Sequence, residues 1–86
     1  MQSEAYTQEA DPIGVLVAFR DRQVTPIAFH WGKKRYRVER VNLTYRRRDG
    51  NKLYYHFAVS SQDNTFDLCF DTIRLEWCLW RANENI

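Results

Sequence analysis

Glycine is scarce in this 86-residue chain, which contains only Gly14, Gly32 and Gly50. So few glycines leave no room for the P-loop or the G-x-G-x-x-G turn that cradles phosphates, and no nucleophile elbow is present. A catalytic pair of carboxylates needs a cleft, which the pattern below does not predict. Asp67 and Asp71 are therefore interpreted as a solvated acidic face, with Asp71 also fixing the following turn. We predict that the protein is not an enzyme.

Cysteine is equally rare, since the chain has only Cys69 and Cys78. Two cysteines form no disulfide framework and are too few for a cysteine-based zinc site. They would face each other only if the last hairpin pairs Phe70 with Trp77. We expect two free thiols. The two histidines, His30 and His56, have no second ligand at a metal-binding spacing, so we predict neither a metal nor a cofactor.

Long apolar runs are also missing, and none approaches the ~18 residues that would cross a membrane. The first twelve residues, MQSEAYTQEADP, are polar and lack the apolar core of a secretory signal. These features lead us to expect a cytoplasmic protein without a membrane partner.

What the sequence does contain is alternation with a period of two residues, which is typical of half-buried β-strands. Short turn signals, such as DGNK at 49–52 and SQDN at 61–64, separate the alternating segments. We predict an all-β protein, a six-stranded antiparallel meander curled into a small barrel that its own side chains fill. The expected strands are 14–21, 24–31, 35–47, 53–60, 66–70 and 75–79.

The third of these strands changes parity. Its apolar and aromatic residues all face inward only if one extra residue is inserted, so we predict a β-bulge near Glu39–Arg40. The inward residues would then be Tyr36, Val38, Val41, Leu43 and Tyr45. Residues 1–11 have no periodicity and are expected to be a disordered tail, followed by one domain over 12–82 and a short C-terminal tail over 83–86.

Charge is distributed unevenly along the chain, although the net charge is only +2. Residues 33–52 carry nine Lys or Arg against Glu39 and Asp49, which gives +7, whereas residues 53–86 are net acidic. Arg and Lys on an exposed surface are the groups that bind nucleic-acid phosphates, and outward aromatic rings can stack on bases. The candidate nucleic-acid-binding residues are Lys33, Lys34, Arg35, Arg37, Arg46, Arg47, Arg48, Lys52, Tyr54 and His56.

These residues could form one stripe or two patches, because the two basic groups lie roughly 35–40 Å apart along a straight strand. Two alternatives stay open. The charges could simply keep the surface soluble and its strand edges unpaired. The domain could instead bind a protein partner through its charge-asymmetric surface or an exposed sheet edge. The sequence does not define the oligomeric state or separate DNA from RNA.

Several motifs follow one another along the chain: Phe29-x-Trp31, Gly32-Lys33-Lys34, Tyr36-x-Val38-x-x-Val41, Tyr55, Phe66-x-Leu68, Asp71 and Trp77-x-Leu79. This series resembles the motifs of a small bacterial family of unknown function. The resemblance covers about residues 24–80 and implies a β-rich domain, without implying catalytic residues. Such domains also occur at the C-terminus of some proteins that resemble Y-family translesion DNA polymerases, which implies an association with DNA-handling proteins. The family places its glycine one residue later after the Trp, so this chain should have a different turn there.

Overall fold

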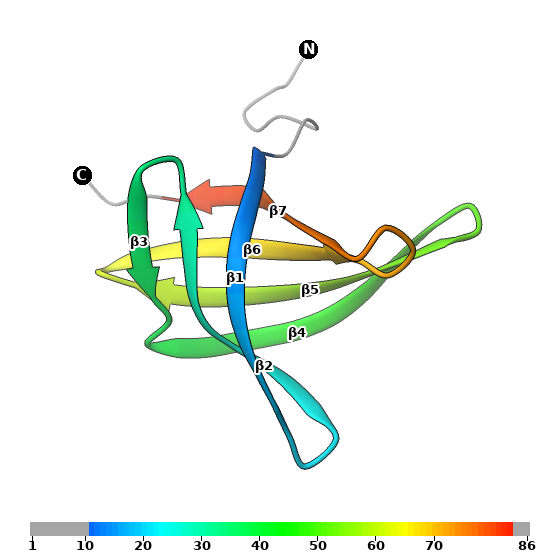
Figure 1. The fold of residues 1–86 in the computed structure, drawn as a ribbon, viewed down its shortest axis with the longest axis horizontal. Coiled ribbons are helices and arrows are strands. Elements are labelled where there is room, and N and C mark those ends of the chain that lie inside the picture. The colour runs from blue at the N-terminus through cyan, green and yellow to red at the C-terminus, as the bar shows by residue number, and fades with distance from the viewer. Residues whose placement is uncertain (1–10, 84–86) are drawn as a thin grey trace.

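The computed structural model describes residues 11–83 as a single antiparallel sheet curled into a half-barrel (Figure 1). The all-β prediction is confirmed, and the described residues contain no helix. The sheet has seven strands rather than the six predicted. They are β1 (Asp11–Arg20), β2 (Gln23–Trp31), β3 (Lys34–Arg37), β4 (Arg40–Asp49), β5 (Lys52–Ser61), β6 (Asn64–Asp71) and β7 (Glu76–Asn83).

The seventh strand arises because the predicted long third strand is divided in two. The strand order is β3-β2-β1-β7-β6-β5-β4, so two consecutive strands, β3 and β4, form the opposite edges of the sheet. Between them, the Val38 N–H donates to the Ile27 carbonyl in β2, and the next N–H, that of Glu39, donates to the Ser60 carbonyl in β5. The chain therefore passes from one end of the sheet to the other within two residues, which curls the sheet.

The structure has a β-bulge near the predicted position at Glu39–Arg40, two residues further along the chain. Val41 pairs with Val59 but Leu43 pairs with Ala58, so the extra residue is Asn42, and its side chain donates to the Ser60 hydroxyl at 2.8 Å. This shift turns Leu43 and Tyr45 to the outer face of the sheet, where Leu43 is 56% exposed. The inward orientation predicted for these two side chains is therefore wrong. It is correct for Tyr36, Val38 and Val41, which belong to the core or pack against it.

Aromatic side chains form the centre of the core, on the inner face of the half-barrel. Phe66 contacts Phe29 with ring centroids 5.1 Å apart and Tyr36 at 5.0 Å, while Phe29 stacks on Tyr36 at 4.8 Å. Large rings supply much of the buried apolar area in so small a domain. The remaining buried core residues are Phe57, Val59, Leu68 and Leu79.

The strands are joined by short turns, as predicted from the turn signals. Asp21 with Arg22, and Gln62 with Asp63, all have positive φ between 54° and 65°. Positive φ at both central residues is the geometry of type I′ turns, whose twist matches that of the flanking strands. These two-residue turns fix the pairing on either side, and so decide which outward side chains lie next to each other.

The domain boundaries differ slightly from those predicted. Asp11, assigned to the N-terminal tail, begins β1 and accepts a hydrogen bond from the Trp31 indole N–H at 3.0 Å. Asn83, assigned to the C-terminal tail, ends β7. The other tail residues, 1–10 and 84–86, lie outside the described part of the chain.

Candidate nucleic-acid interface

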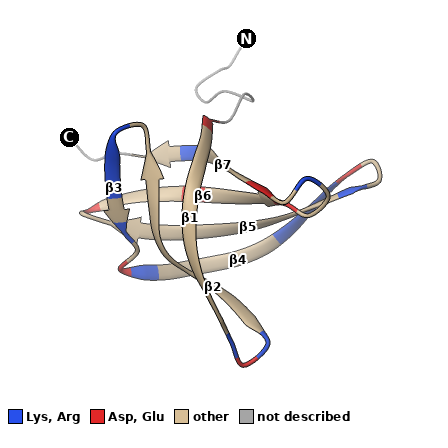
Figure 2. Ribbon diagram, viewed as in Figure 1, with Lys and Arg blue, Asp and Glu red and all other residues tan. Residues whose placement is uncertain are grey.

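The predicted basic residues lie in two separate places rather than in one stripe (Figure 2). One group, which we call the β3 patch, comprises Lys33, Lys34, Arg35, Arg37 and the neighbouring Arg40. The second group, the β4–β5 patch, lies on and beside the hairpin that joins β4 to β5. In Figure 2 this hairpin is at the right of the view, whereas β3 is at the left. The β4–β5 patch comprises Arg46, Arg47, Arg48, Lys52 and Tyr54.

The β3 patch is a set of exposed cations on the edge strand β3, on the turn before it and at the start of β4. Arg35 and Arg37 lie on the outer face, on either side of the buried Tyr36, because successive residues of a strand point to opposite faces. Lys34 lies 5.7 Å from the centre of the Tyr36 ring. Within residues 11–83, none of the five cations has a carboxylate partner, so their charges are free to act on an approaching anion.

A shallow hollow of about 250 Å³ lies beside this patch, on the outer face of β1 and β2. Arg35 and the exposed His30 line it together with Gly14 and Leu16. Gly14 has no atoms within 4 Å of the position that a Cβ would take, so its lack of a side chain leaves this part of the face open.

The β4–β5 patch is split between the two faces of the sheet. Arg46 and Arg48 are exposed on the side of β4 that continues the inner face. Arg46 lines a hollow of about 500 Å³ with Arg22 from the β1–β2 turn. Arg47 points to the outer face, where it is held by other side chains, and Lys52 pairs with Asp71 at 3.8 Å.

Arg47 lies between two aromatic rings. Its guanidinium carbon is 4.3 Å from the ring centre of Tyr54 and 4.3 Å from that of Trp80. The guanidinium is planar, so it can stack on both rings at once. Its Nε–H also donates to Nε2 of His56 at 3.0 Å. Arg47 and Tyr54 are thus engaged in the fold of the outer face, and so is Trp80.

His56 faces away from the apolar core, as predicted, but its side chain is fully buried. Tyr45 stacks on its ring at 4.6 Å, and Trp80 contacts it edge-on at 5.5 Å. The expectation that His56 offers an exposed ring for stacking on bases is therefore wrong. A ring that these neighbours cover has no free face for a base.

Asp67 organises this polar cluster on the outer face. Its Oδ1 lies 2.8 Å from Nδ1 of His56, and its Oδ2 accepts a hydrogen bond from the Tyr45 hydroxyl at 2.5 Å. Burial and this hydrogen bond raise the pKa of Tyr45 to about 12. Asp67 is therefore not a solvated acid, which corrects the interpretation from sequence.

The two charged neighbours of His56, Asp67 and Arg47, act on its pKa in opposite directions. Burial lowers the pKa, but the Asp67 carboxylate favours the imidazolium, and the net value is raised from 6.5 to about 9. Arg47 opposes this change, because it can donate to Nε2 only while that nitrogen keeps its lone pair. The neutral ring with its proton on Nδ1 satisfies both neighbours. Gain of a second proton breaks the contact with Arg47.

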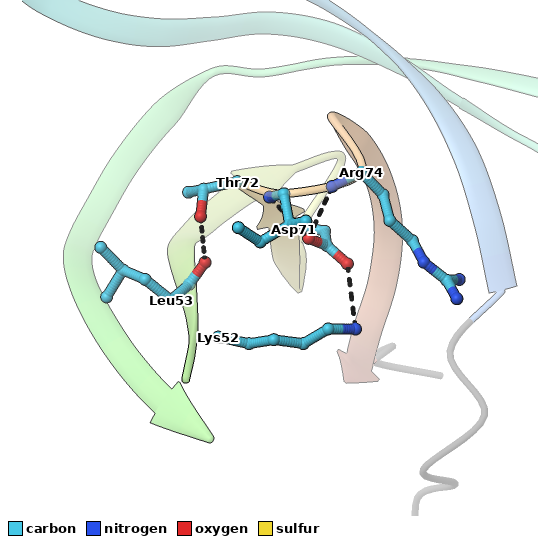
Figure 3. A network of polar contacts seen from close by, with 6 residues as sticks. Lys52, Leu53, Asp71, Thr72 and Arg74 are labelled. Carbon is cyan, nitrogen blue, oxygen red and sulfur yellow. Dashed lines mark hydrogen bonds and ion pairs between the residues drawn. The ribbon is translucent and has the colours of Figure 1, made fainter. Parts of the chain in front are cut away.

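Asp71 fixes the turn between β6 and β7, as predicted (Figure 3). Its Oδ1 accepts hydrogen bonds from the backbone N–H groups of Ile73 at 2.9 Å and Arg74 at 3.0 Å. These bonds and the nearby Lys52 lower the pKa of Asp71. The Thr72 hydroxyl donates to the Leu53 carbonyl at 2.7 Å, which ties the turn to β5.

A wide groove crosses the outer face between these features and has a volume of about 890 Å³. Its walls combine cations, acids and rings, and both cysteines contribute to it. Cys69 and Cys78 are reduced and lie opposite each other, because Phe70 does pair with Trp77. The lining includes Arg47, Lys52, Arg74, Asp71, Tyr54 and Trp80.

Within residues 11–83, no group of three or more His, Cys, Asp or Glu side chains is arranged to hold a metal ion. This part of the chain also has no helix long and apolar enough to span a membrane. The chain matches no family model, no curated protein and no solved structure.

Sequence reasoning did not recognise the cluster of Tyr45, His56 and Asp67, although a signal for it was present. The DGNK turn pairs residue 49 with 52, and the SQDN turn pairs 61 with 64. Counting back from these turns places Tyr45 opposite His56 and His56 opposite Cys69. The register of the hairpins would therefore have revealed one continuous row of polar and aromatic side chains.

Proposed function

We propose that this protein is a small, non-enzymatic, cytoplasmic module that binds nucleic acid through phosphate contacts from the β3 patch. The observation that supports this proposal most directly is the set of five exposed cations without carboxylate partners within residues 11–83. Positive charge in this arrangement attracts a phosphate backbone with little dependence on base sequence. The hollow beside Arg35 offers room for a sugar or base next to these contacts. The association with DNA-handling proteins, implied by the family resemblance, remains a prediction.

Arg46 and Arg48 are a second, weaker set of contacts in this proposal. They are exposed and have no acidic partner within residues 11–83. Arg47 and Lys52, by contrast, already interact with rings or with Asp71. The two patches lie at opposite ends of the ribbon in Figure 2, so they are two separate contact areas and not one stripe.

Fluorescence anisotropy of labelled single- and double-stranded DNA and RNA, at several salt concentrations, tests the proposal. Each phosphate that the protein neutralises contributes about −0.9 to the slope of log K against log salt on B-DNA, because a counterion is released. Five contacts therefore predict a slope of about −4 to −5. Three double variants each remove two positive charges: Arg35→Ala with Arg37→Ala, Arg46→Ala with Arg48→Ala, and Arg20→Ala with Arg22→Ala as the matched control.

We expect the Arg35 and Arg37 pair to cause the largest loss and to make the slope about 2 units shallower. The control pair lies at the β1–β2 turn and should change binding least. Equal losses from all three pairs would mean that only net charge matters, and the assignment to the β3 patch would then be wrong. If no binding is seen at low salt, the nucleic-acid proposal fails.

A protein-interaction module is the second candidate, and the surface offers one observation in its favour. The turn between β6 and β7 exposes two large apolar side chains, with Ile73 66% and Leu75 70% accessible. The edges of the sheet at β3 and β4 are the other surfaces that a partner strand could extend. Light scattering during size-exclusion chromatography, with Leu75→Lys as the variant, tests self-association. A pull-down that compares the wild-type protein with the Leu75→Lys variant tests for other protein partners.

A further inference from the structure

Cys69 in β6 and Cys78 in β7 lie directly opposite each other in the antiparallel register. Opposite residues in such strands have Cα atoms about 4.5 or 5.5 Å apart, and both distances fall within the range that a disulfide spans. Both thiols are on the outer face of the sheet, and each acts on the pKa of the other. A disulfide can therefore form here without a change of strand pairing.

The two thiols are not equivalent. Cys69 is 1% exposed, and the neighbouring Cys78 thiol and burial raise the pKa of Cys69 well above its ordinary range. The neighbouring Cys69 thiol lowers the pKa of Cys78, and the positive charge of Arg47 lowers it further, against the effect of burial. Cys78 is thus the sulfur that carries more thiolate, and the thiolate is the nucleophile.

Access to the two sulfurs also differs. Cys78 is partly exposed and lines the groove of about 890 Å³ on the outer face, a space wide enough for a small peptide. Arg74 lines the same groove, is exposed and has no ion pair within residues 11–83, so it can attract a carboxylate of an anionic thiol compound. Cys69 also lines the groove and lies opposite Cys78, with which it can react, but its burial shields it from a bulky reagent.

We propose that Cys69 and Cys78 form a reversible redox pair, and that the oxidant is an anionic low-molecular-weight disulfide. The Cys78 thiolate attacks one sulfur of this disulfide, forms a mixed disulfide and releases the first small thiolate. Cys69 then attacks the Cys78 sulfur, the bond to the second small thiol breaks, and that thiol leaves with the proton of Cys69. The protein loses two hydrogen atoms and two electrons, and the small disulfide becomes two thiols. This site is independent of the β3 patch.

Oxidised glutathione is the probe for the first experiment, with intact mass measured after an acid quench. We expect the native wild-type protein to lose the mass of two hydrogen atoms and to regain it with dithiothreitol. Peptide mapping should place the bond between residues 69 and 78. Failure of the native protein to form this bond, under conditions in which the urea-unfolded chain does form it, would overturn the proposal.

Single variants test the order of the two steps. Cys69→Ser should stop at a stable glutathione adduct on Cys78, because the resolving thiol is absent. Cys78→Ser should react at least about 10-fold more slowly than Cys69→Ser, since Cys69 is buried and holds its proton. Equal rates for the two variants, with both shown to be folded by circular dichroism, would refute the assigned roles. The wild-type result decides the main proposal even if one variant does not fold.

Discussion

Replacing Asp67 by Asn removes the negative charge that organises the cluster on the outer face. Asp67 contacts both Tyr45 and His56, and the His56 ring is fully buried. Without the carboxylate, burial and the neighbouring Arg47 both favour the neutral ring. We therefore expect Asp67→Asn to lower the pKa of His56 from about 9 to below its ordinary value of 6.5.

The size of the effect on stability follows from this difference in pKa. Each pKa unit corresponds to about 1.36 kcal/mol, so the gap between 6.5 and about 9 sets an upper limit of roughly 3 kcal/mol. The asparagine amide can still make a neutral hydrogen bond, and Arg47 opposes the imidazolium in the wild type. We accordingly expect Asp67→Asn to cost about 2 kcal/mol near pH 6.

The pH dependence of this cost has a definite sign. The folded pKa of His56 is raised above the unfolded value, so the stabilisation is complete below about pH 6.5 and is lost as the pH rises through about 9. Urea unfolding of both proteins between pH 5.5 and 9.5 should show the difference in free energy shrinking over that range. The upper limit of pH 9.5 lies below the pH at which most tyrosines ionise, so the change in stability reports on His56.

Proton NMR of the imidazole ring measures the pKa of His56 directly, and a His30→Asn variant assigns the two histidine signals. The reasoning is refuted if His56 titrates at the same pH in wild type and in Asp67→Asn, or if the stability difference grows with pH. As an independent check, Arg47→Met should raise the pKa of His56, because it removes a nearby positive charge.

Substitutions at three positions, Arg47, Asp71 and Phe66, test other parts of the fold by urea unfolding monitored with tryptophan fluorescence. Arg47→Met should lower the free energy of unfolding by about 1–2 kcal/mol, because two ring contacts are lost. Arg47→Lys should recover little of this stability, because an ammonium is not planar. Full recovery by Lys would contradict the stacking. Asp71→Ala should cost about 1 kcal/mol at pH 7. Because the pKa of Asp71 is lowered, that cost should be present above its ordinary pKa of 3.8 and disappear in stronger acid; a cost that persists there would argue against the charged turn. Phe66→Ala should cost about 3–5 kcal/mol, since the ring is 2% exposed and contacts three other rings; a cost under about 1 kcal/mol would mean that the core can close around the gap.

The alternating pattern predicted the fold class well because one face of each strand is buried and the turns between strands are short. The pattern shows that parity changes between Val38 and Val41, but it does not show how. The structure changes parity at the break at Val38–Glu39, and the extra residue at Asn42 then reverses it, so that Val41 and Leu43 lie on opposite faces. Leu43 misled the prediction because an apolar side chain is tolerated on an outer face.

Charge counting was less informative, because a sequence does not show which charges already have partners. Residues 33–52 carry nine cations, yet Arg47 lies between two rings and Lys52 pairs with Asp71. Both are held by residues more distant in the chain, Asp71 and Trp80, so neither contact is visible in the basic segment itself. Within residues 11–83, the five cations of the β3 patch have no such acidic partners, and three of them lie on β3, whose only neighbour is β2. A place at a sheet edge does not decide this alone, since β4 is also an edge strand and its Arg47 is held by rings. The cations that are free to bind are therefore identified by the side chains that the fold brings beside each of them, and not by the local density of charge.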